Sequence, residues 1–161
     1  MSFEIESLKE KDAEAAAKAL ARSLKGGPAF LQDTKNLSQI LCAKYSVTLV
    51  GKKNGEIVGV IYGASASNQP TIALLGVTDE ECAKAGMGPK LVEGFLAHVK
   101  SHLPNATAVR TSLPADFPEA IALYSSMGFV VEGFVKEYPL AQGRDMVFLK
   151  KAISRSGTPV T

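Results

Sequence analysis

The chain contains no tryptophan and only two cysteines among its 161 residues, Cys42 and Cys82. The two are too far apart in sequence to form a CxxC pair. A cysteine content this low, without that pair, is typical of a cytosolic protein whose thiols are reduced. We therefore expect a cytoplasmic location.

Long apolar runs and an excess of charge are also missing. No run of about 18 apolar residues occurs, and Glu4, Glu6 and Glu10 follow the start, so neither a membrane-spanning helix nor a signal peptide is expected. The formal net charge is +2, and no basic run is interleaved with aromatic residues, so we do not expect nucleic-acid binding. The length suits one domain with a core of its own.

The sequence does contain a strand–turn–helix pattern between residues 71 and 100. An apolar run, Ile72–Val77, is followed by an acidic stretch, the glycine-rich segment Lys84–Pro89 and an amphipathic run, Lys90–Lys100. The start of a helix offers backbone amides without a partner inside the helix, and glycines let a ligand approach the backbone closely. Together these features favour a seat for phosphate or pyrophosphate. A tight turn without any ligand explains the same pattern equally well.

The two commonest nucleotide-binding patterns do not fit this stretch. The dinucleotide fingerprint needs a third glycine where Leu91 stands, and an acidic residue about 20 positions further on, which residues 102–110 do not supply. The Walker pattern is absent as well. The sequence therefore disfavours both of those folds.

Hydrophobic periodicity and turn residues predict eleven elements. In order, they are a strand at Phe3–Ser7, a helix with inward residues from Ala13 to Leu24 that Gly26-Gly27-Pro28 ends, a helix at Thr34–Lys44, strands at Tyr45–Lys53, Glu56–Ala64 and Ile72–Val77, a helix at Lys90–Lys100, a strand at Thr107–Leu113, a helix that opens at Asp116 and closes at Gly128, and strands at Phe129–Tyr138 and Asp145–Lys151. The Asn54-Gly55 hairpin is the strongest local signal. Ser7 and Glu10 have capping-box spacing, with Asp12 as a competing cap.

This order, β-α-α-β-β-β-α-β-α-β-β, predicts an α/β fold. A hairpin-rich first half and a βαβ second half require a mixed sheet of about seven strands, with helices on both faces. We expect a single domain at residues 1–153 and a flexible tail at 154–161.

Three residue types deserve a chemical interpretation from spacing alone. Tyr124 shares a helical face with apolar residues, which favours a core tyrosine over a catalytic one. His98 and His102 lie four apart on one helix, but no third ligand is evident, so no metal site is expected. Cys82 has no histidine partner and is interpreted as an inert small residue.

Residues 120–129, with the pattern A-x-x-L-Y-x-x-x-G-F, closely resemble the C-terminal signature of the GCN5-related N-acetyltransferases. Gly86-x-Gly88 after a strand resembles the acetyl-CoA loop of that family, and residues 54–59 match its usual hairpin. The resemblance covers roughly residues 3–151, with the order of elements agreeing throughout. It implies an acetyl-CoA-dependent transfer of an acetyl group to a primary amine of a small molecule, peptide or protein. It implies no metal, and leaves a homodimer open.

The resemblance also implies the site residues. The pantetheine arm of acetyl-CoA would lie in a gap between the fourth and fifth strands, and the departing thiolate would take a proton or a hydrogen bond from Tyr124. The implied cofactor-binding backbone belongs to Leu75, Gly76 and Val77 for the pantetheine arm, and to Lys84, Ala85, Gly86, Met87 and Gly88 for the pyrophosphate. The acceptor would be set by residues 13–44 and 137–144.

Three positions depart from the family pattern. Ala83 stands where the family usually has Gln or Arg, and Phe117 replaces a frequent Asn. The strand Ile72–Val77 carries no glutamate, so a frequent family base is missing. These departures keep two further hypotheses open: a CoA- or nucleotide-binding module without catalysis, and an interaction protein that has lost CoA binding.

Overall fold

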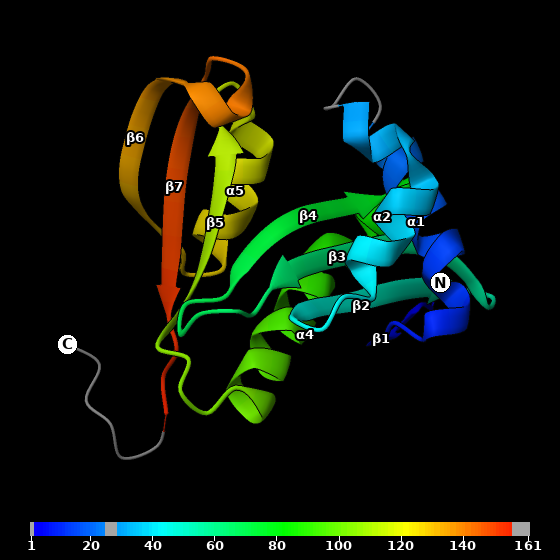
Figure 1. The fold of residues 1–161 in the computed structure, drawn as a ribbon. Helices are drawn as coiled ribbons and strands as arrows, with labels where there is room; N and C mark the ends of the chain where they lie inside the picture. Colours follow the sequence, from blue (N-terminus) through cyan, green and yellow to red (C-terminus); the bar gives the residue numbers. More distant parts are fainter. Residues whose placement is uncertain (1, 25–28, 156–161) are drawn as a thin grey trace.

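The computed structural model describes residues 2–24 and 29–155 and contains one seven-stranded sheet with helices on both faces (Figure 1). The predicted helix end at Gly26-Gly27-Pro28 and most of the predicted tail lie outside the described residues. The elements are β1 (Glu4–Ser7), η1 (Glu10–Asp12), α1 (Ala13–Ser23), η2 (Ala29–Gln32), α2 (Thr34–Leu41), β2 (Ser46–Lys53), β3 (Glu56–Ala64), β4 (Thr71–Val77), α3 (Glu80–Lys84), α4 (Met87–His102), β5 (Ala108–Pro114), α5 (Pro118–Ser126), β6 (Val130–Tyr138), η3 (Pro139–Ala141) and β7 (Arg144–Ala152).

The sheet is mixed, as predicted. Its strands lie in the order β1-β2-β3-β4-β5-β7-β6, and every neighbouring pair is antiparallel except β4 and β5. The parallel pair is joined through α4, which makes the βαβ unit expected from the sequence. The β2–β3 hairpin turns at Asn54 and Gly55 with φ of 53° and 80°. Both values are positive, which is the backbone geometry that an Asn-Gly turn favours.

Two apolar layers hold the helices on the sheet. On one face, α1 and α2 bury Ala16, Ala17, Leu20 and Leu37 against the first strands. On the other face, a larger cluster joins α4 and α5 to the sheet around Phe95. The small side chains of α1 allow the close helix packing that its alanine repeat predicted. None of the helices in residues 2–24 and 29–155 combines the length and the apolar character that crossing a bilayer requires.

Several predicted helix boundaries are wrong. Helix α4 begins at Met87, whereas the helix was expected to begin after Gly88 with Pro89 in its first turn, and the acidic stretch after β4 forms the short helix α3. Asp79 explains α3, because its carboxylate accepts a hydrogen bond from the Cys82 amide at 2.9 Å and caps the helix. Gly86, with φ of 93°, then reverses the chain directly into α4.

The first two helices also differ from expectation at their ends. No side-chain hydrogen bond caps α1, so the predicted capping box is absent, and the Asp12 carboxylate lies 3.6 Å from the Lys52 ammonium instead. Helix α2 ends at Leu41, three residues early. Its Asp33 cap accepts from the Asn36 amide at 3.1 Å.

Candidate functional site

The central feature of the sheet is an opening between β4 and β5. The two strands are paired only at Thr71 with Arg110 and at Ile72 with Thr111. Beyond Ile72, β4 stays paired with β3 and β5 stays paired with β7, so the two strands diverge (Figure 1). Residues 74–77 are half-buried although β4 is the middle strand of the sheet, which means that solvent reaches this edge.

The backbone of β4 presents alternate residues to this opening. The Thr78 amide donates to the Val58 carbonyl at 2.7 Å, and this pair belongs to the same register as the β3–β4 ladder. In an antiparallel ladder, hydrogen-bonded and non-hydrogen-bonded pairs alternate. The N–H and C=O groups of Gly76 therefore point towards β3, whereas those of Leu75 and Val77 point into the opening. A ligand that runs along this edge of β4 would meet the backbone groups of these two residues.

Gly76 has a different part in the site. A Cβ atom built on it would lie 2.0 Å from Ser23 Oγ and 2.9 Å from Ser23 Cβ. The glycine therefore allows the end of α1 to pack closely on β4. This contact holds α1 beside the opening.

The glycine turn lies at the start of α4, on the side of the sheet that α5 also covers. The Ala85 and Gly86 amides already donate to the carbonyls of Glu81 and Ala83 at 2.9 and 3.2 Å. Bonding within α4 begins when the Lys90 amide donates to the Gly86 carbonyl at 3.1 Å. The amides of Met87 and Gly88 thus have no acceptor inside the helix, and Pro89 has no N–H. Of the predicted seat, these two amides are without an acceptor inside a helix, and both residues are buried, Met87 completely.

Met87 anchors this turn to the sheet. Its side chain is completely buried and lies in a slot between β2 and β3. A Cβ atom on Gly51 or on Gly59 would lie 2.6 Å from Met87 Sδ, so a larger residue at either position would require the buried Met87 side chain to shift. The first turn of α4 is therefore fixed by side-chain packing as well as by the backbone of Gly86. Gly88 faces α5, since a Cβ on it would lie 3.5 Å from Leu123 Cδ1.

Acidic side chains near the turn are matched by lysines. Lys53 Nζ lies 3.1 Å from carboxylate oxygens of both Asp79 and Glu81, and the exposed Lys84 lies 2.9 Å from Glu80. The pKa of the Asp79 carboxyl is lowered, first by the Cys82 amide and then by Lys53. The pKa of Lys53 is raised by its hydrogen bonds to Asp79 and Glu81. Two lysines thus offset two of the three negative charges beside the turn.

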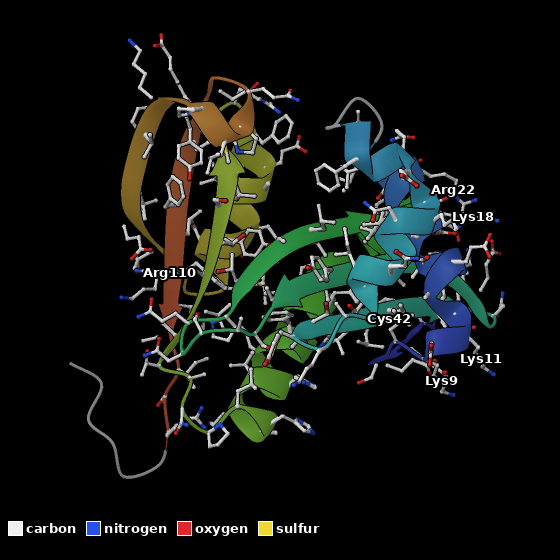
Figure 2. The ribbon with its side chains drawn as sticks, in the orientation of Figure 1. Lys9, Lys11, Lys18, Arg22, Cys42 and Arg110 are labelled. Carbon is white, nitrogen blue, oxygen red and sulfur yellow. The ribbon has the colours of Figure 1, made fainter. Side chains whose placement is uncertain are left out.

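Other exposed cations lie away from the opening. Figure 2 shows Lys9, Lys11, Lys18 and Arg22 along the outer side of α1 and of the turn before it, and Arg110 on β5. Arg110 is held by Glu132 on the neighbouring part of the sheet, with Nε 2.9 Å from the carboxylate. These side chains do not form a single basic surface around the glycine turn.

Tyr124 lies at the closed end of the opening. Its side chain is 3% exposed and packs edge-on against Phe129, with ring centroids 5.2 Å apart. The neighbouring Thr111 hydroxyl donates to the Ile72 carbonyl at 3.1 Å. Burial raises the pKa of Tyr124 to about 12, while Thr111 acts in the lowering direction. The hydroxyl therefore keeps its proton at neutral pH.

The remaining sequence candidates do not join this site. His98 and His102 stack at a ring-centroid distance of 4.3 Å, and no group of three potential metal ligands occurs in the described part of the chain. Burial, followed by Asp79, raises the pKa of the Cys82 thiol. Phe117 is exposed at the start of α5, with the Arg144 guanidinium 4.9 Å from its ring.

The sequence analysis did not single out three residues that shape the site. Gly51 and Gly59 lie inside strands, and a strand glycine is a general sign that something approaches the backbone closely. That sign would have pointed to the Met87 slot. Thr111 gave no comparable signal, because its importance depends on which residue of β4 it pairs with.

The comparisons with known proteins agree with this architecture. No protein-family model matches the chain, and no curated protein matches its sequence. Among solved structures, the ribosomal-protein-S18-alanine N-acetyltransferase from Escherichia coli is 20% identical, has a TM-score of 0.80 and covers 99% of both chains. An acetyltransferase of the GNAT family from Streptococcus pneumoniae is 19% identical, with a TM-score of 0.72 over 95% of this chain and 100% of that one.

A third similar structure has a different kind of acceptor in its name. Mutant forms of the spermidine/spermine N-acetyltransferase SpeG from Vibrio cholerae are 15% identical to the chain, with a TM-score of 0.67 over 94% of this chain and 95% of that one. At these identities the likeness concerns the fold. It agrees with the mixed seven-stranded sheet and the helices on both of its faces described above. The chain therefore has the fold of the GNAT-family acetyltransferases.

Proposed function

We propose that the chain is an acetyl-CoA-dependent N-acetyltransferase that transfers the acetyl group directly to a primary amine. The observation that carries this proposal is the early divergence of β4 and β5, with the glycine turn of α4 nearby. The fold shared with named acetyltransferases supports it.

In this proposal, acetyl-CoA binds through the backbone. The pantetheine arm would lie along β4 and bond the outward groups of Leu75 and Val77. The diphosphate would rest on the amides of Met87 and Gly88, at the positive end of the α4 dipole. Lys84 stands close in sequence, although Glu80 holds its ammonium at 2.9 Å in this structure.

The chemistry requires a neutral amine. A lysine-like amine has a pKa of about 10.4 and must lose a proton before its nitrogen attacks the thioester carbonyl carbon. The new C–N bond forms as the C–S bond breaks, and the electron pair of that bond leaves with sulfur. The nitrogen loses a second proton after the C–N bond has formed. The strand β4 carries no carboxylate, so we propose that both protons leave through water.

Tyr124 would stabilise the departing thiolate. Its pKa of about 12 lies above the roughly 8.5 of an ordinary thiol, so complete transfer of its proton to the thiolate is unfavourable. A hydrogen bond from the neutral hydroxyl is favourable, and the thiolate would take its proton from solvent. We therefore propose Tyr124 as a hydrogen-bond donor in the transition state.

The second candidate is a CoA-binding module without catalysis. Two observations favour it: Ala83 leaves the turn without a long polar side chain, and Tyr124 is only 3% exposed. Calorimetry with acetyl-CoA followed by free-thiol release separates the two functions. The amine panel would include an alanine peptide, a lysine peptide and spermidine. Binding with amine-dependent thiol release supports the enzyme, binding without release supports the module, and no binding rejects both.

We also propose a homodimer and a cytoplasmic location. The edge strand β6 exposes the apolar side chains of Val130, Val131 and Phe134, which a second copy could cover. Sedimentation equilibrium of the wild type and of Phe134→Lys tests the dimer, because the charge should weaken association. A monomeric wild type would reject it. The location rests on the scarcity of cysteine.

A further inference from the structure

One face of the strands β5, β7 and β6 lies outside the apolar layer that holds α1 and α2. Paired residues of an antiparallel ladder share a face, and neighbours along a strand alternate between the two faces. Leu113 and Leu149 belong to the cluster beneath α4 and α5. Ser112 and Phe148, which are paired with each other, therefore lie on the opposite face. Helices α1 and α2 cover that face over the earlier strands (Figure 1), and their cluster includes no residue of β5, β6 or β7 from the described ranges.

This uncovered face is the one from which an amine would reach the opening. The glycine turn and α4 lie on the other face, and in the proposed function they hold the diphosphate. The acetyl group, at the far end of the cofactor, would then be approached from the side away from α4. Thr111 is the last residue of β5 that pairs with β4, so Ser112 and Phe148 form the first β5–β7 pair beyond the closed end of the opening.

Phe148, Tyr138 and Gly133 form an aromatic shelf on this face. The rings of Phe148 and Tyr138 meet edge-on, with centroids 5.5 Å apart and planes at 89°. Both residues are half-buried, and neither belongs to the two apolar clusters of the core. Gly133 pairs with Phe148 from β6, and a Cβ atom built on Gly133 would meet nothing closer than Phe148 Cβ, at 4.0 Å. The shelf therefore has open space beside the Phe148 side chain.

The charges next to the aromatic shelf do not suit a polycation. Arg110 and Lys150 are paired across β5 and β7, and they share a face with Ser112 and Phe148. Glu132 lies between the two cations, 2.9 Å from Arg110 Nε and 4.0 Å from Lys150 Nζ. These three residues leave an excess of one positive charge. A polyamine would be repelled here, whereas a monoamine with an apolar group would place that group on the rings.

We propose that the aromatic shelf selects the acceptor, a primary monoamine that carries an aromatic ring at the spacing found in phenethylamine. This inference rests on the proposed function, which places the acetyl group in the β4–β5 opening. Cross-strand neighbours lie about 5 Å apart, so a short linker spans the distance from the opening to Phe148. Rings that meet edge-on or in offset stacks gain more than the area that they bury. Arylalkylamines and peptides that begin with phenylalanine share this spacing.

Tryptamine tests the aromatic shelf through binding alone. It has the required spacing, and the chain contains no tryptophan, so the indole fluorescence comes from the ligand. Fluorescence anisotropy of tryptamine, titrated with the full chain in the presence and absence of CoA, gives the Kd. Phe148→Leu keeps an apolar side chain and removes the ring, and it should weaken binding about fivefold to tenfold. If Phe148→Leu does not fold, Gly133→Leu replaces it with a similar expected loss, because a side chain there covers the shelf.

Tyr45→Leu is the matched control. Tyr45 carries another exposed ring, 56% exposed, on the turn before β2 in the first half of the sheet. Removing this ring should leave the Kd of tryptamine within about twofold of the wild-type value. Equal losses in Phe148→Leu and Tyr45→Leu would overturn the inference. Absence of tryptamine binding to the wild type, with and without CoA, would overturn it as well.

Thiol release from acetyl-CoA separates this inference from the proposed function. We expect kcat/KM to be about tenfold higher for phenethylamine, or for a peptide that begins with phenylalanine, than for butylamine and spermidine. Whichever of the two aromatic amines is preferred identifies the source of the ring. Equal or faster transfer to butylamine or spermidine would keep the acetyltransferase and overturn the aromatic selection. Tryptamine binding that depends on Phe148, without thiol release from any amine, would reject the enzyme and support the aromatic site.

Discussion

Tyr124 is enclosed by apolar side chains, and this burial raises the pKa of its hydroxyl and affects its contribution to stability. Burial disfavours the phenolate, so the hydroxyl keeps its proton at physiological pH, as the proposed donor role requires. A core tyrosine and a hydrogen-bond donor to a ligand are compatible roles here, because the ring is buried while the hydroxyl lies at the vertex of the opening.

Substitution of the hydroxyl separates these roles. Tyr124→Phe should lower turnover by about 10- to 100-fold, somewhat less than a full general acid contributes, because the proton is shared and not transferred. The affinity for acetyl-CoA in calorimetry should change less than about twofold. Unchanged turnover would remove Tyr124 from the chemistry.

The raised pKa of Tyr124 predicts a stability change at high pH. An unfolded tyrosine ionises near pH 10, whereas folded Tyr124 keeps its proton up to a pKa of about 12. Between these values the unfolded state binds fewer protons, so the free energy of unfolding falls as pH rises. A difference of two pKa units between folded and unfolded tyrosine corresponds to a loss of roughly 2–3 kcal/mol in the free energy of unfolding. Urea unfolding from pH 9 to 12 should show this loss in the wild type relative to Tyr124→Phe. Parallel curves for the two proteins would contradict the burial of the hydroxyl.

At the scale of elements, α4 is placed by two devices: the left-handed backbone of Gly86 and the glycine slot that receives Met87. The first sets where the helix starts, and the second fixes its first turn on β2 and β3. Both devices are present in the ligand-free chain. Each can therefore be tested by measuring the free energy of unfolding without a ligand.

Alanine at the two glycines of the turn should have opposite effects. At Gly86, with φ of 93°, an added Cβ meets nothing within 4 Å but favours another backbone conformation, so Gly86→Ala should cost about 1–2 kcal/mol. At Gly88, inside the helix, the Cβ makes an ordinary contact with Leu123, and the change should be neutral or stabilise by up to about 1 kcal/mol. Thermal or urea unfolding of the pair measures the difference, and equal effects would be evidence against the left-handed turn.

The Met87 slot predicts coupling between two positions. Gly51→Ala should lower the free energy of unfolding by about 1–3 kcal/mol because it overpacks the slot, and this cost should disappear in a Met87→Ala background. Gly133→Ala on β6 is the control, since its nearest atom would be 4.0 Å away, and we expect a change within about 0.5 kcal/mol. Additive costs for Gly51 and Met87 would show that the two do not meet.

At the scale of the whole molecule, the sequence predicted the order of strands and helices because periodicity and turn residues are local signals. Asn54-Gly55 and the alanine repeat of α1 are examples in which the local signal and the packing agree. The start of α4 was misplaced because the Asp79 cap and the Met87 slot depend on neighbours distant in sequence. The same reason explains why Thr111 was overlooked: its partner across the sheet, Ile72, is known only from the register.

The central claim is that acetyl-CoA enters the opening between β4 and β5 and rests on the first turn of α4. Amide NMR with residue-level hydrogen exchange, on a chain of 17.0 kDa, tests this claim most directly. Addition of acetyl-CoA should shift the amide signals of Leu75, Val77, Met87 and Gly88 and slow their exchange, while the amides of β1 and α2 stay unchanged. Saturable binding that leaves those four amides unperturbed, or no binding at all, would contradict the account.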